Sequence, residues 1–84
     1  MEKRIGIVNI VLYDIAAAKQ VNALLSSYSP HILSRSGLPL REKGIYIINI
    51  IIEQSADEIN SLTGKLGRLQ NVEVKCLLTK VQCE

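Results

Sequence analysis

Residues 45–58, IYIINIIIEQSADE, decide the fold because the most apolar stretch of the chain leads there directly into a helix start. The run Ile45–Glu53 is rich in β-branched residues and has Asn49 as its one interior polar residue, which predicts a strand. Ser55 and Glu58 match a capping box, in which the serine side chain accepts a helix N–H and the glutamate side chain reaches back. A strand followed at once by a helix is therefore expected here.

The residues after this start continue the helix and then predict another strand. Apolar residues recur at helical spacing, at Ile59, Leu62, Leu66 and Leu69. Gly67 is expected to loosen or end the helix, and a turn is expected at Gln70 and Asn71. Residues 72–80 then alternate between apolar and polar side chains, as in a strand.

The residues before the central stretch repeat the pattern. Ile5–Leu12 is an apolar, β-branched run and predicts a strand. Asp14 is a suitable helix N-cap, and the alanine-rich residues that follow favour a helix that ends before Pro30. Residues 31–41 predict a weaker strand, which must lie at a sheet edge because Pro39 cannot donate a ladder hydrogen bond.

The turn signal at residues 42–44 predicts a hairpin between the strand over residues 31–41 and the strand over residues 45–53. The element order is therefore β-α-β-β-α-β. Two split βαβ units of this length predict an α+β fold, the ferredoxin-like sandwich. Its antiparallel sheet has strand order 4-1-3-2, with two helices on one face. The length of 84 residues supports a single domain over residues 1–84, with a core from about residue 4 to residue 80 and a tail at 81–84.

Both faces of the two central strands are apolar, unlike those of an antiparallel sheet that meets water on one side. One face carries Asn9 and Asn49 among its apolar residues, and amides are easier to satisfy at an interface than in a helix-packed core. We therefore expect a homo-oligomer, a homodimer or homotetramer, that buries this face. The expected interface residues are Ile7, Asn9, Val11, Ile47, Asn49 and Ile51.

Composition narrows the class of protein. The chain is 48% hydrophobic with a net charge of only +2, which excludes a disordered chain and argues against direct nucleic-acid binding. Three tyrosines are its only aromatic residues, too few on the central strands to stack RNA bases. The longest apolar stretch, Ile45–Ile52, is well short of the ~20 residues of a membrane helix, and no signal peptide is evident, so no membrane partner is expected.

The residues needed for catalysis or metal binding are sparse. The single histidine, His31, has no triad spacing around it, and no phosphate-binding glycine loop occurs, so we expect no enzyme activity and no cofactor. His31 could join Cys76 or Cys83 on a transition metal, but no metal site is predicted, and metal binding by these three stays open. Two cysteines without a C-x-x-C motif favour a reducing, cytoplasmic setting.

The complete pattern resembles a small ACT-like regulatory domain. The resemblance rests on residues 4–14, on the helix end at 21–26 and on residues 62–74. More closely, residues 35–39 and 44–48 are similar to a stand-alone family of proposed iron-only hydrogenase system regulators. That family is similar to the C-terminal effector domain of nickel-responsive repressors. Their nickel ligands are not carried over, because Ser36, Leu38 and Gly44 stand at the matching positions.

The resemblance implies a non-enzymatic regulator of a hydrogenase-type or other metabolic system, with a role in transcription regulation. The first predicted strand begins near the N-terminus, so no DNA-reading segment is expected before it. An effector would sit between protomers near the first strand–helix junction. The candidate ligand-binding residues are Tyr13, Asp14, Ile15, Ala16, Gly37 and Leu38. These residues also fit ordinary capping and packing roles, and an adaptor that recruits a protein partner through the edge strand is the alternative.

Overall fold

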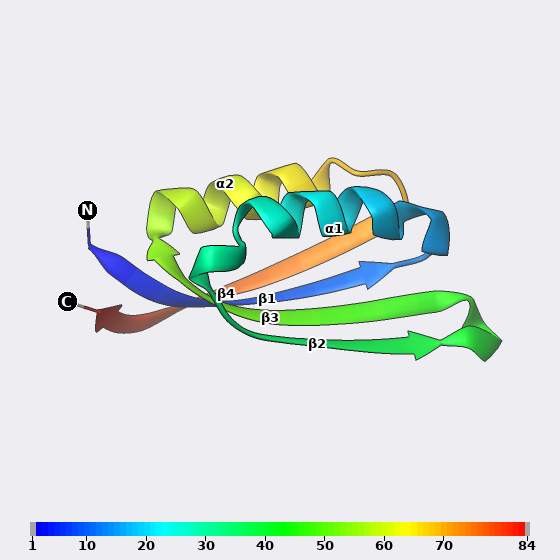
Figure 1. Cartoon of the computed structure of the whole chain (residues 1–84), viewed down its shortest axis with the longest axis horizontal. Coiled ribbons are helices and arrows are strands. Elements are labelled where there is room, and N and C mark those ends of the chain that lie inside the picture. Colours follow the sequence, from blue (N-terminus) through cyan, green and yellow to red (C-terminus); the bar gives the residue numbers. More distant parts are fainter. Residues whose placement is uncertain (1, 84) are drawn as a thin grey trace.

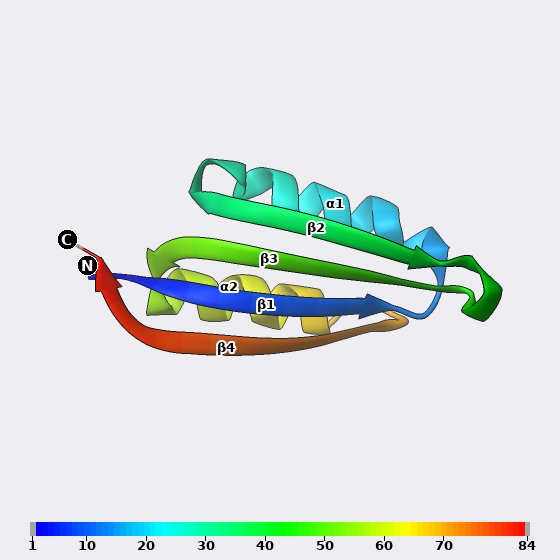
Figure 2. The same ribbon diagram turned by 90° about the horizontal axis from the view of Figure 1, so that it is seen from below.

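The computed structural model describes residues 2–83 and confirms the βαββαβ order (Figure 1). The strands and helices are β1 (Lys3–Leu12), α1 (Ala18–Ser27), β2 (Ile32–Leu40), β3 (Ile45–Ser55), α2 (Ala56–Gly67) and β4 (Val72–Cys83). The sheet order is β2-β3-β1-β4 and each neighbouring pair is antiparallel, so the predicted order and the α+β class are confirmed. Figure 2 shows the sheet from below, with β1 and β3 at its centre.

Both helices lie on one face of the sheet (Figure 1). The core fills the space between the helices and the sheet. The central strands turn every second side chain toward the helices. The buried strand residues are Val8, Ile10 and Leu12 of β1 and Ile48, Ile50 and Ile52 of β3. The buried helix residues are Val21, Leu25, Ile59, Leu62 and Leu66. The spacing of Ile59, Leu62 and Leu66 therefore marks the face of α2 that closes the core, while Leu69 lies beyond the end of the helix.

The first helix starts later than predicted. Asp14 caps as expected, because its Oδ1 accepts a hydrogen bond from the backbone N–H of Ala16 at 3.0 Å. The cap leads, however, into a short 3₁₀ turn, Ile15–Ala17, before the α-helix begins at Ala18. The N–H of Ala17 bonds the carbonyl of Asp14 at 3.0 Å, and this tight i to i+3 bond turns the chain from strand to helix.

Only one of the two hydrogen bonds predicted for the capping box of α2 is present. The Oγ of Ser55 accepts from the N–H of Glu58 at 3.3 Å, as predicted. The backbone N–H of Ser55 donates instead to Oε1 of the adjacent Gln54, at 2.8 Å. That bond occupies the donor that Glu58 was expected to satisfy, and Glu58 stays exposed. The return bond predicted from Glu58 is therefore wrong.

Three strands, β1, β3 and β4, are longer than the sequence pattern indicates, whereas β2 is slightly shorter. Lys3 pairs with Ser55 on β3 and with Cys83 on β4, so β1 holds both neighbours along its whole length. β4 therefore continues through residues 81–83, which were expected to form a tail. A register shift between Arg4 and Gly6 separates this end of the β1–β4 pair from the rest. The domain is elongated as a result, with extents of 43 × 19 × 19 Å.

Candidate functional site

The sheet face opposite the helices has no covering element among residues 2–83, and we call it the open face (Figure 2). Ladder register and alternation place all six predicted interface residues here. They form three cross-strand pairs: Ile7 with Ile51, Asn9 with Asn49 and Val11 with Ile47. Asn9 is exposed and the other five are partly exposed, so their side chains are free to meet another surface.

Side chains on the open face form rows across the four strands. The central row is polar and runs Ser36, Asn49, Asn9, Lys75. The rows on either side are largely apolar: Leu38, Ile47, Val11, Glu73 on one side, and Ser34, Ile51, Ile7, Leu77 on the other. Leu38 and Leu77 are 55% and 59% exposed. The open face is thus an apolar surface divided by one polar row.

The centre of the polar row is a hydrogen bond between two amides. Nδ2 of Asn49 donates to Oδ1 of Asn9 at 2.6 Å. The amide nitrogen of Asn9 and the amide oxygen of Asn49 take no part in this bond and are available for hydrogen bonds to another surface. The middle of the open face therefore presents one donor group beside one acceptor.

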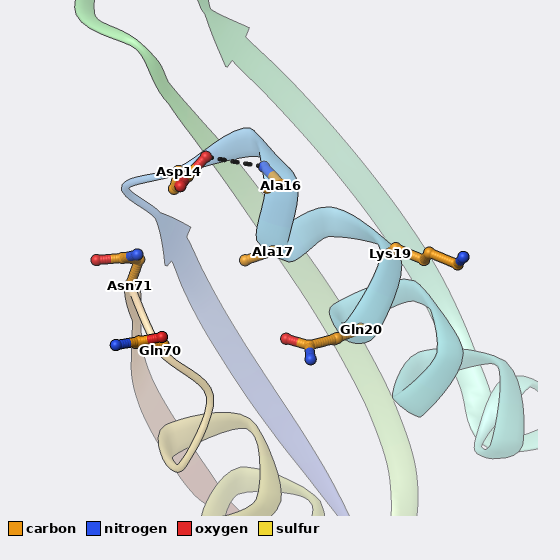
Figure 3. Close-up of a pocket in the computed structure, with 7 residues that line it drawn as sticks. All are labelled: Asp14, Ala16, Ala17, Lys19, Gln20, Gln70 and Asn71. Carbon is orange, nitrogen blue, oxygen red and sulfur yellow. Dashed lines mark hydrogen bonds between the residues drawn. The ribbon is translucent and has the colours of Figure 1, made fainter.

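A second feature lies where β1 passes into the first helix (Figure 3). A shallow cavity of about 310 Å³, which we call the junction cavity, opens between this junction and the turn before β4. Its lining residues are Asp14, Ala16, Ala17, Lys19, Gln20, Gln70 and Asn71. The backbone N–H of Tyr13 bonds the carbonyl of Asn71 at 2.8 Å and holds the two sides of the cavity together. A carboxylate and three amides thus border one small space, and the Lys19 side chain leaves its rim pointing away from it (Figure 3).

The structure brings together only part of the predicted ligand-binding set. Asp14 and Ala16 line the junction cavity. Ile15 lines a different hollow, of about 390 Å³, with Pro39, Arg41, Gly44 and Ile45. Gly37 and Leu38 are adjacent on β2 and so lie on opposite faces of the sheet. Gly37 faces the ring of Tyr46, and Leu38 lies on the open face.

Five residues of the cavity lie outside the predicted ligand-binding set: Ala17, Lys19, Gln20, Gln70 and Asn71. A signal for two of them existed. Residues 70 and 71 form the turn before β4, and Val72 pairs with Leu12 at the end of β1. An antiparallel partner of β1 must begin beside the place where β1 ends, so its preceding turn lies at the same junction.

Tyr13 links the junction to the open face. Its hydroxyl donates a hydrogen bond to a carboxylate oxygen of Glu73, which stands in the same row as Val11. The pKa of Tyr13 is raised above its ordinary value, first by this hydrogen bond and then by the negative charge of Glu73. The neutral phenol is therefore the form that the pair favours.

The described side chains include no cluster of metal ligands. Within residues 2–83, no group of three or more His, Cys, Asp or Glu side chains is arranged to hold a metal ion. Cys76 is half-buried and packs against the core, and the side chain of Cys83 lies outside the described part.

No helix in the described range has the length and apolar character needed to span a membrane.

Several solved structures share this architecture. The uncharacterized protein TM1266 from Thermotoga maritima is 42% identical over 94% of this chain and 100% of its own, with a TM-score of 0.90. The ACT domain from the GTP pyrophosphokinase of Chlorobium tepidum is 23% identical over 89% of this chain and 99% of its own, with a TM-score of 0.76. That likeness shows the ACT-like fold. An unknown protein from Galdieria sulphuraria has a TM-score of 0.70 at 13% identity, over 95% of this chain and 47% of its own.

No curated protein sequence matches the chain. One family model does match, over residues 4–76, and it covers both central strands, both helices and the junction cavity. The chain therefore belongs to the TM1266-like family, which is described as "Iron-only hydrogenase system regulator, putative".

Proposed function

We propose that the chain is a non-enzymatic regulatory domain of an iron-only hydrogenase system, working as a homo-oligomer that binds a small polar effector. The observation that carries this proposal is the open face, where apolar pairs such as Val11 with Ile47 are partly exposed on both central strands. Surfaces of this kind mark association sites, because apolar area removed from water stabilises a complex. Family membership supplies the regulated system.

The junction cavity suits a small effector that carries charge. Asp14 and Lys19 offer opposite charges, and Gln20, Gln70 and Asn71 add amide donors and acceptors. A small zwitterion such as an amino acid could pair its ammonium with Asp14, and its carboxylate with Lys19 once that exposed side chain turns toward the cavity. All five side chains are exposed, so such a ligand would reach them without opening the core.

The pair formed by Tyr13 and Glu73 offers a route from this cavity to the open face. Tyr13 follows β1 directly and its backbone holds Asn71, a cavity residue. Its hydroxyl holds Glu73, which borders Val11 on the open face. An effector that shifts the junction would move Glu73 and so change how the open face associates, provided that it binds the two arrangements with different affinity.

The proposal is tested by a thermal-shift screen of the whole chain with amino acids and divalent metal ions, together with sedimentation at micromolar concentration. A ligand that binds only the folded state raises the midpoint of unfolding. We expect a polar, charged compound to do so and Lys19→Ala to abolish the shift. Lys80→Ala, which removes the same charge from the exposed surface of β4, is the matched control. No shift with any compound, or a shift that survives Lys19→Ala, would count against the effector site.

A second candidate function, an adaptor for a protein partner, is favoured by the outer edge of β2. This strand lies at the edge of the sheet beside β3, is exposed along most of its length and carries Leu33 at 59% exposure. An extended peptide could add to that edge through backbone hydrogen bonds, except at Pro39. A monomeric chain that binds a stoichiometric partner and shows no ligand response would favour the adaptor over the sensor.

A further inference from the structure

We propose that a second copy of this chain covers the open face, related to the first by a two-fold axis that runs along the strands between β1 and β3. In this arrangement Asn9 of each copy meets Asn49 of the other. The inference rests on the homo-oligomer of the proposed function and gives it a defined geometry. It also assigns a role to the polar row, which is to set the register of the two sheets.

The size of the open face fits such a pairing. Four strands spaced by about 4.8 Å, with ten residues rising about 3.4 Å each, project an area of about 650 Å² before the relief of the side chains is added. A stable protein–protein interface buries about 800 Å² on each partner. The chain also exposes 5423 Å², whereas a monomer of its mass is expected to expose about 5,000 Å². The open face thus comes close to the area of a standard interface even before side-chain relief is counted.

The two asparagines are self-complementary under a two-fold axis. Within one copy, the bond from Asn49 to Asn9 leaves the Asn9 nitrogen as donor and the Asn49 oxygen as acceptor. When Asn9 of one copy lies over Asn49 of the other, that nitrogen donates to that oxygen twice, once in each direction. Four amides then close a ring of four hydrogen bonds. Burial of the face would otherwise leave these groups unsatisfied, at a cost of about 1–3 kcal/mol for each group.

Lys75 decides between the two axes available to face-to-face sheets. An axis across the strands would place Lys75 over Lys75 of the second copy, and like charges in direct opposition are unfavourable. An axis along the strands places Lys75 over the hydroxyl of Ser36, at the other end of the same row. It also lays β1 over β3, so that Val11 packs on Ile47 of the second copy. Both sheets then keep the aligned orientation common in β-sandwiches.

Cross-linking between introduced cysteines tests this geometry. The native thiols are first removed in a Cys76→Ala, Cys83→Ala background. Ser36→Cys and Lys75→Cys are then introduced, separately and together, and treated with dibromobimane, a short thiol cross-linker suited to facing side chains of sheets about 10 Å apart. Within one chain these two positions are separated by β3 and β1, at opposite edges of the sheet, so they are too far apart to be linked.

We expect the double variant to give a covalent dimer on a denaturing gel, with at least tenfold less dimer from either single variant. Each position would lie over its counterpart only if the axis crossed the strands. Efficient linking of the Ser36→Cys single variant would therefore overturn the proposed axis and leave the homo-oligomer standing. Sedimentation of the unmodified chain as a monomer at micromolar concentration would overturn both.

The amide ring has its own test. Asn9→Asp replaces the donor nitrogen by an oxygen, so the second copy's Asn49 oxygen loses its partner and a charge enters the interface. We expect the dimer dissociation constant to rise at least tenfold, while circular dichroism of the monomer stays unchanged. Ser61→Asp on the exposed side of α2 adds the same charge away from the open face and is the control. A dissociation constant that is equal in both variants would exclude the ring.

Discussion

Asn9 and Asn49 lie directly opposite each other on the two central strands, and Nδ2 of Asn49 donates to Oδ1 of Asn9 at 2.6 Å on the face that carries no helix. Isoleucine and valine flank this pair along both strands. On the opposite face of the same strands, the valine, leucine and isoleucine side chains under the helices are fully buried, and the Gln54 amide lies at the end of that face. The amide pair therefore distinguishes a surface suited to association from the surface that forms the core.

A charge placed on the open face should separate the protomers without unfolding them. Ile47 is partly exposed in the single chain, so Ile47→Lys should leave the fold intact, but its charge would be buried in an oligomer. We expect the dissociation constant to rise by a factor of about 30 or more, as for a central interface residue worth ~2 kcal/mol. Sedimentation over a concentration series measures the effect. Asn60→Lys on α2 is the control, and an equal assembly state in both variants would place the interface elsewhere.

The two hydrogen bonds at the start of α2 predict an unequal response to substitution. Ser55→Ala removes the cap to Glu58 and should lower the free energy of unfolding by about 1 kcal/mol. Gln54→Ala should cost about 0.5–1.5 kcal/mol because the N–H of Ser55 loses its acceptor. Glu58→Gln should cost only about 0.3 kcal/mol, from the weaker charge at the helix start. Urea denaturation measures the free energy of unfolding of all three variants. If Glu58→Gln lowered it as much as Ser55→Ala does, the return hydrogen bond from Glu58 would be present after all.

Two glycines should respond to alanine in opposite directions. Gly64 lies inside α2 with open space around the position of an added Cβ, so Gly64→Ala should raise the free energy of unfolding by about 0.5–1 kcal/mol. Gly44 has a φ of +69° in the turn before β3, so Gly44→Ala should lower it by about 1–2 kcal/mol. Chemical denaturation at neutral pH compares the two variants. A stabilising Gly44→Ala would contradict the left-handed turn.

The contact between Tyr13 and Glu73 predicts a shifted tyrosine titration. Because Glu73 raises the pKa of Tyr13 in the folded chain, the stabilising effect of the contact is present at neutral pH and fully retained up to the unfolded-state pKa. It is lost as pH rises further, through the folded-state pKa. Ultraviolet difference titration of the wild type against Tyr13→Phe isolates this residue. Glu73→Gln should move the pKa of Tyr13 back toward 10, and an unmoved titration would show that the contact is absent in solution.

The sequence by itself determined the order and type of the elements. Periodicity in residues 45–52, the caps at Asp14 and Ser55 and the proline in the edge strand act over a few neighbouring residues, so they can be recognised without knowledge of the fold. The period-two alternation that separates core from open face also follows from the sequence. The same rule would have placed Gly37 and Leu38 on opposite faces, which the ligand-binding set overlooked.

Only the tertiary structure decided which distant residues meet. Lys19 and Asn71 line one cavity because β4 begins where β1 ends. The hydroxyl of Tyr13 reaches the carboxylate of Glu73 for the same reason. The extension of β4 to Cys83 likewise depends on the unpaired backbone that β1 offers it. Such contacts join residues that are far apart in sequence, and strand register, which depends on the packing of the whole sheet, selects them.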